Sequence, residues 1–510
     1  MNVWVLSLDI GTTSVKAAAV TLDGQSLASR TSPYRTHRPR PNVVEHDPND
    51  WWAATRKACA ELFGASGVEP SDLVAVGLSG MAATHVLLGA DGGLMGPAII
   101  WQDTRATREA ARLNEQLGED GIRAALGSGI GMTASMQGAR MLWLHENAPE
   151  LLAGTRHILG SKDYLLYLLT GELATDRTSC SGLCHILTGE LHAAMASATG
   201  VDASLLPPRL DPTTVGGRVT AGASRATGIP EGTPVAVGMI DSWCNILGAA
   251  VTDPGDAFDT AGTAEVVGVA AAANSRLAQT SERQFLTEVA LSYGVTQCGT
   301  DALTWYGEVF PEHGADGAQL GEDSLYRHLD GLADSAAPGA DGLIFLPYLQ
   351  GERAPFSDSR VRAGFHGVHR GHRRPDFVRS VLEGVAFSVR HVLEAHEELG
   401  EVQASQVVVT SGGSKSRLWN QIKADVVGRP FASLEVSDAG SVGAAILGAV
   451  AVGRYSITEG VERMVRIATV SEPQPGLRDR YDELYGLYLQ LGTTLRDVHH
   501  RIADYQAREG

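Results

Sequence analysis

The segment Asp9-Ile10-Gly11-Thr12-Thr13-Ser14 lies between two short apolar runs, at residues 3–8 and 15–20. Two such runs joined by a Gly-rich turn predict a β-hairpin. Glycine lets a backbone approach a phosphate, and Thr12, Thr13 and Ser14 add amide and hydroxyl donors. Asp9 could hold a Mg²⁺ ion, usually through water, because Mg²⁺ loses its hydration shell reluctantly. The alternative interpretation is a plain hairpin turn, since the motif by itself is a weak signal.

The same pattern returns as Asp259-Thr260-Ala261-Gly262-Thr263, again followed by a β-prone run. Two copies of one turn in the two halves of a chain indicate a duplicated domain. We place the boundary in the turn-rich link Asp253-Pro254-Gly255-Asp256, which predicts domains of residues 1–252 and 253–510. Two such hairpins facing each other would hold a polyphosphate from both sides.

Between the two turns, Val237-Gly238-Met239-Ile240-Asp241-Ser242 brings a carboxylate to the start of a predicted helix. A strand that ends at Gly and leads into such an Asp places the carboxylate at the mouth of a cleft, where it can accept a proton from a bound hydroxyl. Asp is also among the best helix N-cap residues, and for an isolated Asp we would favour the cap. The two flanking phosphate loops make Asp241 the predicted catalytic base.

The composition is that of an ordinary globular protein that is too long for one core. The chain has 510 residues, of which 44% are hydrophobic, and a net charge of −18. Single cores stop growing at about 250–300 residues, so two large domains are expected. The negative charge argues against nucleic acid or an anionic membrane as the main partner. No run approaches the ~20 apolar residues of a membrane span, and five scattered cysteines suggest free thiols. We therefore expect a cytoplasmic protein.

Other segments carry candidate binding residues. Trp101-Gln102-Asp103 could line a polyol pocket, with Asp103 accepting hydroxyl protons and Trp101 giving an apolar wall. A strand end with a capping Asp and a buried Trp is an equally good interpretation. Lys16 lies inside the first hairpin and could reach a phosphate. Near the end of the chain, an apolar helical stripe is expected to pack on the body of the protein; it contains Leu484, Leu487, Leu491, Leu495, Val498 and Ile502.

Taken together and in this order, the motifs resemble the FGGY family of carbohydrate kinases nearly end to end. Asp9 to Thr13 and Gly262-Thr263 look like the family's two phosphate loops, and Gly238-x-x-Asp241 matches the position of its catalytic Asp. Gly364-Phe365-His366-Gly367-Val368 fits its C-terminal signature, and Gly412-Gly413-Ser414-Lys415-Ser416 is similar to its adenosine loop.

The resemblance implies an α/β protein of two actin-like (ribonuclease-H-like) domains with an interdomain cleft. It implies ATP and Mg²⁺, with Asp9 near the metal and Asp241 as the base. The nucleotide would be bound by Gly11, Thr12, Thr13, Lys16, Gly262, Thr263, Gly412, Gly413 and Arg417. The sugar would lie in the N-terminal domain and contact Met81, Ala82, Trp101, Asp103 and Asp241. A homodimer is one expected assembly.

Two departures from the family pattern affect the interpretation. Arg140 stands where Lys is usual, and Gln137 where Pro, Ser or Thr is usual. After Gly80 the chain has Met81-Ala82-Ala83-Thr84, where xylulokinases resemble one another in a Gln-Met-His-Gly run. The favoured substrate is a ketopentose such as xylulose. Gluconate, a tetritol and another ketose are alternatives. An actin-like nucleotide switch without sugar kinase activity is a further alternative, which the two alanines keep open.

Overall fold

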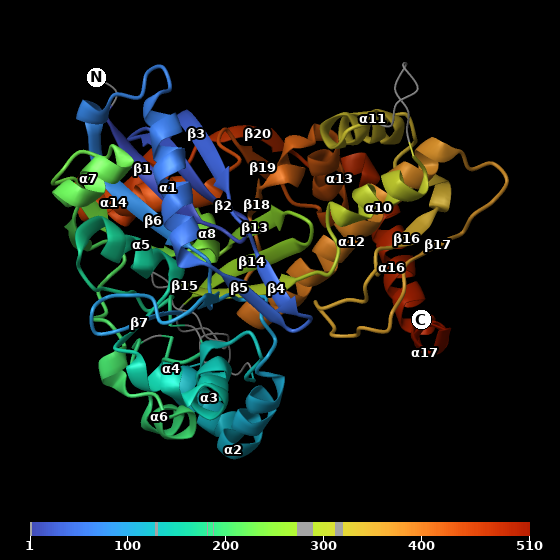
Figure 1. Ribbon diagram of the computed structural model, residues 1–510. Coiled ribbons are helices and arrows are strands. Elements are labelled where there is room, and N and C mark those ends of the chain that lie inside the picture. Colours follow the sequence, from blue (N-terminus) through green and yellow to red (C-terminus); the bar gives the residue numbers. More distant parts are fainter. Residues whose placement is uncertain are drawn as a thin grey trace. The chain divides into compact units, whose positions relative to one another are not determined.

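A seven-stranded sheet is the centre of the first of two units in the computed structural model, which describes residues 3–127, 131–180, 182–186, 188–272, 289–311 and 320–509. Its strands have the order β10-β11-β6-β1-β2-β3, and β12 also pairs with β6. Figure 1 labels β1, β2, β3 and β6 of this sheet. β1 is antiparallel to β2 and parallel to β6, which confirms the first predicted hairpin. The bounds are β1 Trp4–Ile10, β2 Ser14–Thr21, β3 Ser26–Pro33, β6 Leu73–Gly80, β10 Val215–Arg218, β11 Pro234–Ala236 and β12 Met239–Ile240.

Helices and two small sheets complete this unit. β4 (His37–Arg40), β5 (Val43–His46) and β8 (Ala98–Ile99) form one small sheet, and β7 (Val86–Leu88) pairs with β9 (His157–Leu159). α5 (Ser161–Thr170) is followed by Gly171, whose left-handed conformation caps the helix. The other helices are α1 Pro48–Phe63, α2 Thr107–Leu126, α3 Gln137–Asn147, α4 Pro149–Gly154, α6 Ala193–Thr199, α7 Ala221–Thr227 and α8 Asp241–Gly248.

The first unit also contains a segment from much later in the chain. Besides Met1–Ala250, it includes Asp438–Arg466, which contains α14 (Ala439–Ala451) and α15 (Ile457–Met464). The backbone of α14 lies directly on β6 and α8. A Cβ at Gly77 would come within 1.8 Å of the Ala444 carbonyl oxygen, and one at Gly443 within 1.9 Å of the Cys244 carbonyl oxygen. The predicted boundary between residues 252 and 253 assigns this later segment to the second domain, whereas it packs in the first unit.

The second unit repeats the arrangement of the first sheet. Its six strands have the order β15-β14-β13-β18-β19-β20, with β13 antiparallel to β14 and parallel to β18. An antiparallel hairpin beside a parallel strand is the pattern of β1, β2 and β6, which agrees with the predicted duplication. The bounds are β13 Asp256–Ala261, β14 Glu265–Ala272, β15 Val289–Val295, β18 Gln406–Thr410, β19 Phe431–Leu434 and β20 Ile467–Ser471.

One long helix, α12 (Arg374–Gly400), organises the core of the second unit against the paired strands β16 (Ile344–Leu346) and β17 (Gly364–His366). The other helices are α10 Asp301–Val309, α11 Glu322–Asp334, α13 Arg417–Val427, α16 Arg478–Thr494 and α17 Arg496–Glu509. The predicted C-terminal stripe is wrong in part. α16 buries Tyr481, Tyr485 and Tyr488, whereas Leu487, Val498 and Ile502 are exposed. The amphipathic tyrosines pack on Phe387 of α12, so they form the true inner face.

Candidate active site

Three neighbouring strand ends bring the first Gly-Thr turn and Asp241 to one edge of the first sheet. Ile10 of β1 and Ile240 of β12 both pair in parallel with Gly80 of β6. The next residue of each strand therefore leaves the sheet at the same edge, because parallel strands end together. These residues are Gly11, Met81 and Asp241. Segments far apart in the sequence thus form one site.

The turn that follows β1 is built to leave amide groups free. The amide of Gly11 donates to the Ser14 carbonyl at 3.0 Å, which closes the turn. The amides of Thr12 and Thr13 donate to no backbone carbonyl within the described residues. Tyr34 supports the turn from behind, since its amide donates to Thr13 O at 3.1 Å and its hydroxyl to Gly11 O. Successive free amides form a concave site for an anion such as phosphate.

Asp241 is the first residue of α8, and Ile240 occupies the N-cap position. Its half-buried carboxylate accepts a hydrogen bond from the Ser242 amide at 2.7 Å. Burial, and to a smaller extent the negative charge of Asp9, raise the pKa of Asp241 to about 7 against the opposing effect of hydrogen bonds from the Ser242 and Ala82 amides. A carboxylate that titrates near neutral pH is suited to act as a general base. The geometry thus fits the predicted base better than a simple cap.

Asp9 faces a small polar cluster. Ser79 Oγ donates to Asp9 Oδ1 at 2.6 Å. Burial raises the pKa of Asp9, the hydrogen bond from Ser79 lowers it, and Asp438 and Lys16 act in opposite directions. Lys16 Nζ lies 3.0 Å from Asp438 Oδ2, so this predicted phosphate contact forms an ion pair in the structure. Sequence reasoning missed Ser79 and Asp438. Asp438 caps α14 by accepting from Ser441, and that Asp-x-x-Ser pattern was its only local signal.

The predicted substrate residues divide into two groups. Trp101 is 44% exposed, and its Nε1 donates to Thr12 Oγ1 at 3.0 Å, which puts the indole beside the phosphate turn. Ala82 is half-buried next to Asp241. The side chain of Met81, in contrast, is buried in the core of the unit, and the Met81 amide donates to Ile10 O at 2.9 Å.

Asp103 has a structural environment. Its side chain is fully buried and accepts hydrogen bonds from the Val44 amide at 2.7 Å and from the Arg105 amide and guanidinium. Arg105 also pairs with Glu45 at 2.6 Å. The oxygens of Asp103 are thus occupied in holding the loop after β8 against β5. These contacts favour the loop-structuring interpretation of this residue, and direct contact with substrate stays a prediction.

In the second unit, Gly262 and Thr263 form a turn like that of Gly11 and Thr12. The amide of Gly262 donates to Ala264 O at 3.1 Å, and within the described residues the Thr263 and Ala264 amides donate to no backbone carbonyl. Asp259, however, does not take the place of Asp9. It is fully buried and 2.6 Å from Lys423 Nζ, which also pairs with Glu265 at 3.2 Å. The position two residues before the glycine, which Asp9 holds in the first turn, belongs to Thr260.

The predicted adenosine loop lies beside this second turn. β13 and β18 are parallel neighbours, and Thr410 Oγ1 donates to Thr260 Oγ1 at 3.3 Å. Gly413 packs so closely on Ala261 that a Cβ would meet it at 2.7 Å, whereas Gly412 faces open space. Arg417 begins α13 and is exposed. A turn with free amides and an open glycine loop therefore lie next to each other.

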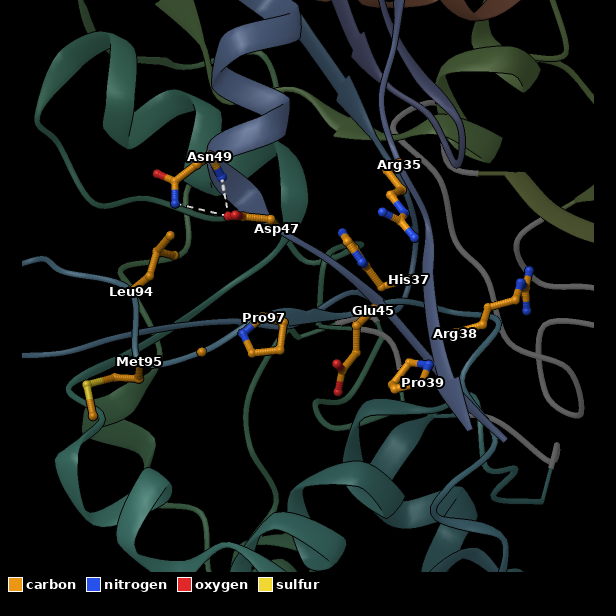
Figure 2. Close-up of a pocket in the computed structure, with 11 residues that line it drawn as sticks. Arg35, His37, Arg38, Pro39, Glu45, Asp47, Asn49, Leu94, Met95 and Pro97 are labelled. Carbon is orange, nitrogen blue, oxygen red and sulfur yellow. Dashed lines mark hydrogen bonds between the residues drawn. The ribbon is translucent and has the colours of Figure 1, made fainter. Parts of the chain in front are cut away.

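A separate pocket of about 700 Å³ lies in the first unit near β4 and β5 (Figure 2). Arg35, His37 and Arg38 give it basic groups, and Glu45 and Asp47 give it acidic ones. Its lining includes none of the predicted substrate residues. Figure 2 shows Asn49 donating to Asp47, which is the cap of α1. This hollow is therefore distinct from the site at the sheet edge.

A cluster of Asp341, His369 and His372 in the second unit places three possible metal-ligand atoms within 4.8 Å of one another. The Nδ1 atom of His369 accepts from the Gly371 amide, and that of His372 from the His369 amide. Each neutral ring then carries its proton on Nε2, the nitrogen directed at Asp341. The cluster is thus a hydrogen-bonded loop in its present form.

All five cysteines are free and buried. No helix in the described part of the chain has the length and apolar character needed to span a bilayer.

A repeated hairpin with free amides, an open glycine loop and a carboxylate with a raised pKa are features that a nucleotide-dependent phosphotransferase requires. Comparison with known proteins agrees. Residues 4–248 match the N-terminal domain of the FGGY family of carbohydrate kinases, and residues 258–452 match its C-terminal domain. The chain therefore belongs to the FGGY family. Its fold is the ribonuclease H-like, actin-like α/β fold of that family, it is a carbohydrate kinase, and kinases of this family use ATP as a substrate.

Individual relatives cover almost the whole chain. A xylulose kinase of Bacillus subtilis (strain 168) is 28% identical over 517 residues, which covers 99% of this chain and 99% of that protein. The crystal structure of xylulose kinase from Rhodospirillum rubrum has a TM-score of 0.83 and 31% identity, covering 98% of this chain and 100% of that one. A gluconokinase of Bacillus licheniformis is 25% identical over 517 residues and covers 99% of both chains.

Proposed function

We propose that this protein transfers the γ-phosphoryl group of ATP to a primary hydroxyl of a ketopentose, with xylulose as the favoured substrate. The observation that carries the proposal is the convergence of Gly11, Trp101 and Asp241 at one sheet edge. The names of the relatives support the choice of xylulose, since both the Bacillus subtilis protein and the Rhodospirillum rubrum structure are xylulose kinases.

In the proposed reaction, Asp241 accepts the proton of the attacking hydroxyl. Its pKa of about 7 keeps a useful fraction ionised at neutral pH while making it a stronger base than an exposed Asp. The exposed indole of Trp101 gives the sugar an apolar wall beside Thr12. The phosphoryl group then passes between substrates that the protein holds in line, so positioning and charge stabilisation supply most of the rate.

The nucleotide contacts are proposed from the two turns and the glycine loop. The free amides of Thr12 and Thr13 bind phosphate oxygens, as do those of Thr263 and Ala264 in the turn that Gly262 closes. Gly412 and Gly413 lie along the adenosine because Gly412 leaves open space, and the exposed Arg417 contacts the nucleotide. Lys16 is held by Asp438 and would have to exchange that ion pair for a phosphate.

Mg²⁺ fits the residues around Asp9. A carboxylate that is held by one hydrogen bond from Ser79 presents hard oxygen ligands, and Mg²⁺ prefers one or two carboxylates with retained waters. When bound, the ion would neutralise charge on the phosphates of ATP. We propose Asp9 as its protein contact.

Gluconate, a tetritol and another ketose stay as alternatives, and the gluconokinase relative supports the first. Ala82 and Ala83 cannot hydrogen-bond a hydroxyl through their side chains. A site without such donors rejects close analogues less strongly. We therefore expect weaker preference for xylulose than a dedicated xylulose kinase shows.

The test is an ADP-release assay with ATP, Mg²⁺ and a panel of D-xylulose, D-ribulose, D-fructose, D-gluconate, erythritol and glycerol. We expect turnover with a sugar to exceed the ATPase background at least about tenfold, with the highest kcat/KM on a ketopentose. Ala83→His should raise selectivity among sugars. Strong selectivity of the wild type for gluconate would overturn the proposal that the substrate is a ketopentose. ATP hydrolysis that no sugar affects would favour a nucleotide switch.

We also propose a cytoplasmic homodimer, on the basis of the intracellular substrate ATP and the expectation from sequence. Sedimentation equilibrium of the purified chain would test the assembly.

A further inference from the structure

A buried network of charged and hydroxyl groups borders the strand that delivers Asp241. Its centre is Lys162, the second residue of α5, which is 1% exposed. Lys162 Nζ lies 2.6 Å from Asp163 Oδ1 and 2.9 Å from Asp176 Oδ1. Burial opposes the charge of Lys162, but the two carboxylates outweigh it and raise the pKa of this ammonium. The ion triad is therefore held in its charged form inside the unit.

The network is hydrogen-bonded to both ends of residues 237–240, the segment before Asp241. Lys162 Nζ donates to the Val237 carbonyl at 3.2 Å. At the other end, the Ile240 amide donates to Thr178 Oγ1 at 3.2 Å, and that hydroxyl in turn donates to Asp176 Oδ2. Thr178 thus links the ion triad to the residue that immediately precedes Asp241.

The segment between these two hydrogen bonds has little conformational freedom. Gly238 has a φ of 74°, and a Cβ there would lie 2.1 Å from the Leu78 carbonyl oxygen. The same end of α5 also holds the loop on the other side of Asp241. A Cβ at Gly80 would meet Ser161 Oγ at 2.5 Å, and Ser161 Oγ donates to Met81 O at 3.3 Å. The start of α5 therefore borders both segments that contact the carboxylate.

Resting on the proposed function, we propose that Lys162, Asp176 and Thr178 are positioning residues for the phosphoryl transfer, which set the place of the Asp241 carboxylate through the backbone of residues 237–240. A buried ion triad of purely structural value would need no contact with this segment. Misplacing a reacting group by about 1 Å costs roughly 10²-fold in rate, so the network should affect kcat more than substrate affinity.

The test uses a pair of isosteric changes within the one network. Thr178→Val removes the hydroxyl that joins Asp176 to Ile240. Thr175→Val is the matched control, because Thr175 is equally buried and donates to Asp163 Oδ2 at 2.7 Å, but the network gives it no contact with residues 237–241. Thr178→Ser keeps the hydroxyl. Steady-state kinetics, Tm and the pH profile of kcat/KM are measured for each variant.

We expect Thr178→Val to lower kcat about 10–100-fold with KM for ATP and sugar changed less than about threefold, and to move the midpoint of the pH profile. Thr178→Ser should recover most of kcat, and Thr175→Val should keep kcat at a similar loss of Tm. Equal kcat losses in the Thr178→Val and Thr175→Val proteins would overturn the inference, as would an unchanged kcat and pH profile in Thr178→Val. Should Thr178→Val not fold, Thr178→Ala is measured in its place with the same criteria.

A readout without turnover separates this inference from the proposed function. The pH dependence of the Tm difference between a protein and its Asp241→Asn form reports the titration of Asp241 directly. If Asp241→Asn keeps full turnover while Thr178→Val shifts that titration, the positional link is supported and the catalytic role of Asp241 is wrong. If Asp241→Asn is inactive and Thr178→Val shifts nothing, the proposed function stands and the positioning role is wrong.

Discussion

Replacing Asp241 by Asn tests both the chemistry and the electrostatics of the site. The amide keeps the size of the side chain and an oxygen for the Ser242 amide, but it cannot accept a proton. A general base contributes roughly 10²–10⁴ in rate, so kcat should fall by that factor while ATP affinity stays within about twofold. In the wild type, kcat/KM should rise with pH and reach half its plateau near pH 7, because the base must be ionised.

The same change should stabilise the fold above neutral pH. A pKa raised to about 7 from an ordinary value of 3.8 means that folding disfavours the ionised carboxylate. Each pKa unit corresponds to about 1.4 kcal/mol, so the full penalty is about 4 kcal/mol, which partial solvent exposure reduces to about 2 kcal/mol. The unfolded chain ionises first as pH rises, so the wild type loses this stability between pH 3.8 and about 7.

We therefore expect Asp241→Asn to raise Tm by about 4–8 °C at pH 8 for a domain of this size. The gain should shrink steadily on lowering the pH to 5. Differential scanning calorimetry from pH 5 to 8 and the ADP-release assay measure the two effects on one sample. Asp202→Asn is the control, because the Ser204 amide lowers the pKa of Asp202 and no gain at pH 8 is expected there. A Tm difference that is independent of pH, or kcat within threefold of wild type, would refute the reasoning.

The remaining predictions concern nucleotide binding and packing. Gly262→Val should weaken ATP binding at least about tenfold by calorimetry, because the added side chain occupies the proposed phosphate turn. Sugar affinity should change little, because the new Cβ would come no closer than 3.5 Å to the rest of the fold, and equal losses for both ligands would indicate misfolding instead. Gly77→Ala should cost about 3 kcal/mol or more in urea unfolding, since a carbonyl oxygen of α14 lies 1.8 Å from the new Cβ, whereas Gly222→Ala in α7 should cost nothing. Asp103→Asn should destabilise the fold by about 1–3 kcal/mol because the buried guanidinium of Arg105 loses one of its two carboxylate partners and keeps Glu45, and unchanged stability would favour a substrate role for Asp103.

Local patterns predicted most of the elements around the site. The apolar runs on each side of Gly11 form β1 and β2, and the same pattern at Gly262 forms β13 and β14. α5 begins at Ser161 and ends at Gly171, because hydrogen bonds within a few residues decide where a helix starts and stops.

Residues whose role depends on distant partners were the ones that local patterns misplaced. Asp259 precedes a Gly-Thr turn as Asp9 does, but one residue further from the glycine, and it forms a buried ion pair with Lys423 of α13. The predicted C-terminal stripe had the correct helical period but lay on the wrong face of the helix, because the tyrosines of α16 are the residues that pack on Phe387. A repeat of 3.6 residues identifies a helix, but several faces can satisfy it when apolar and aromatic residues alternate.

The sequence by itself determined the two Gly-Thr hairpins and the position of Asp241 at a helix start, because each depends on residues within about ten positions of one another. It also determined the duplicated order of the motifs, because a repeated motif is recognised at any separation along the chain. Only the tertiary structure decided that α14 returns to the first unit, that Asp103 is bound to Arg105, and that Asp9 raises the pKa of Asp241. Burial and charge are set by whatever the fold brings alongside a residue. For Asp241 those neighbours are Asp9, Ala82 and, through the preceding strand, Thr178, which lie up to 232 positions away along the chain.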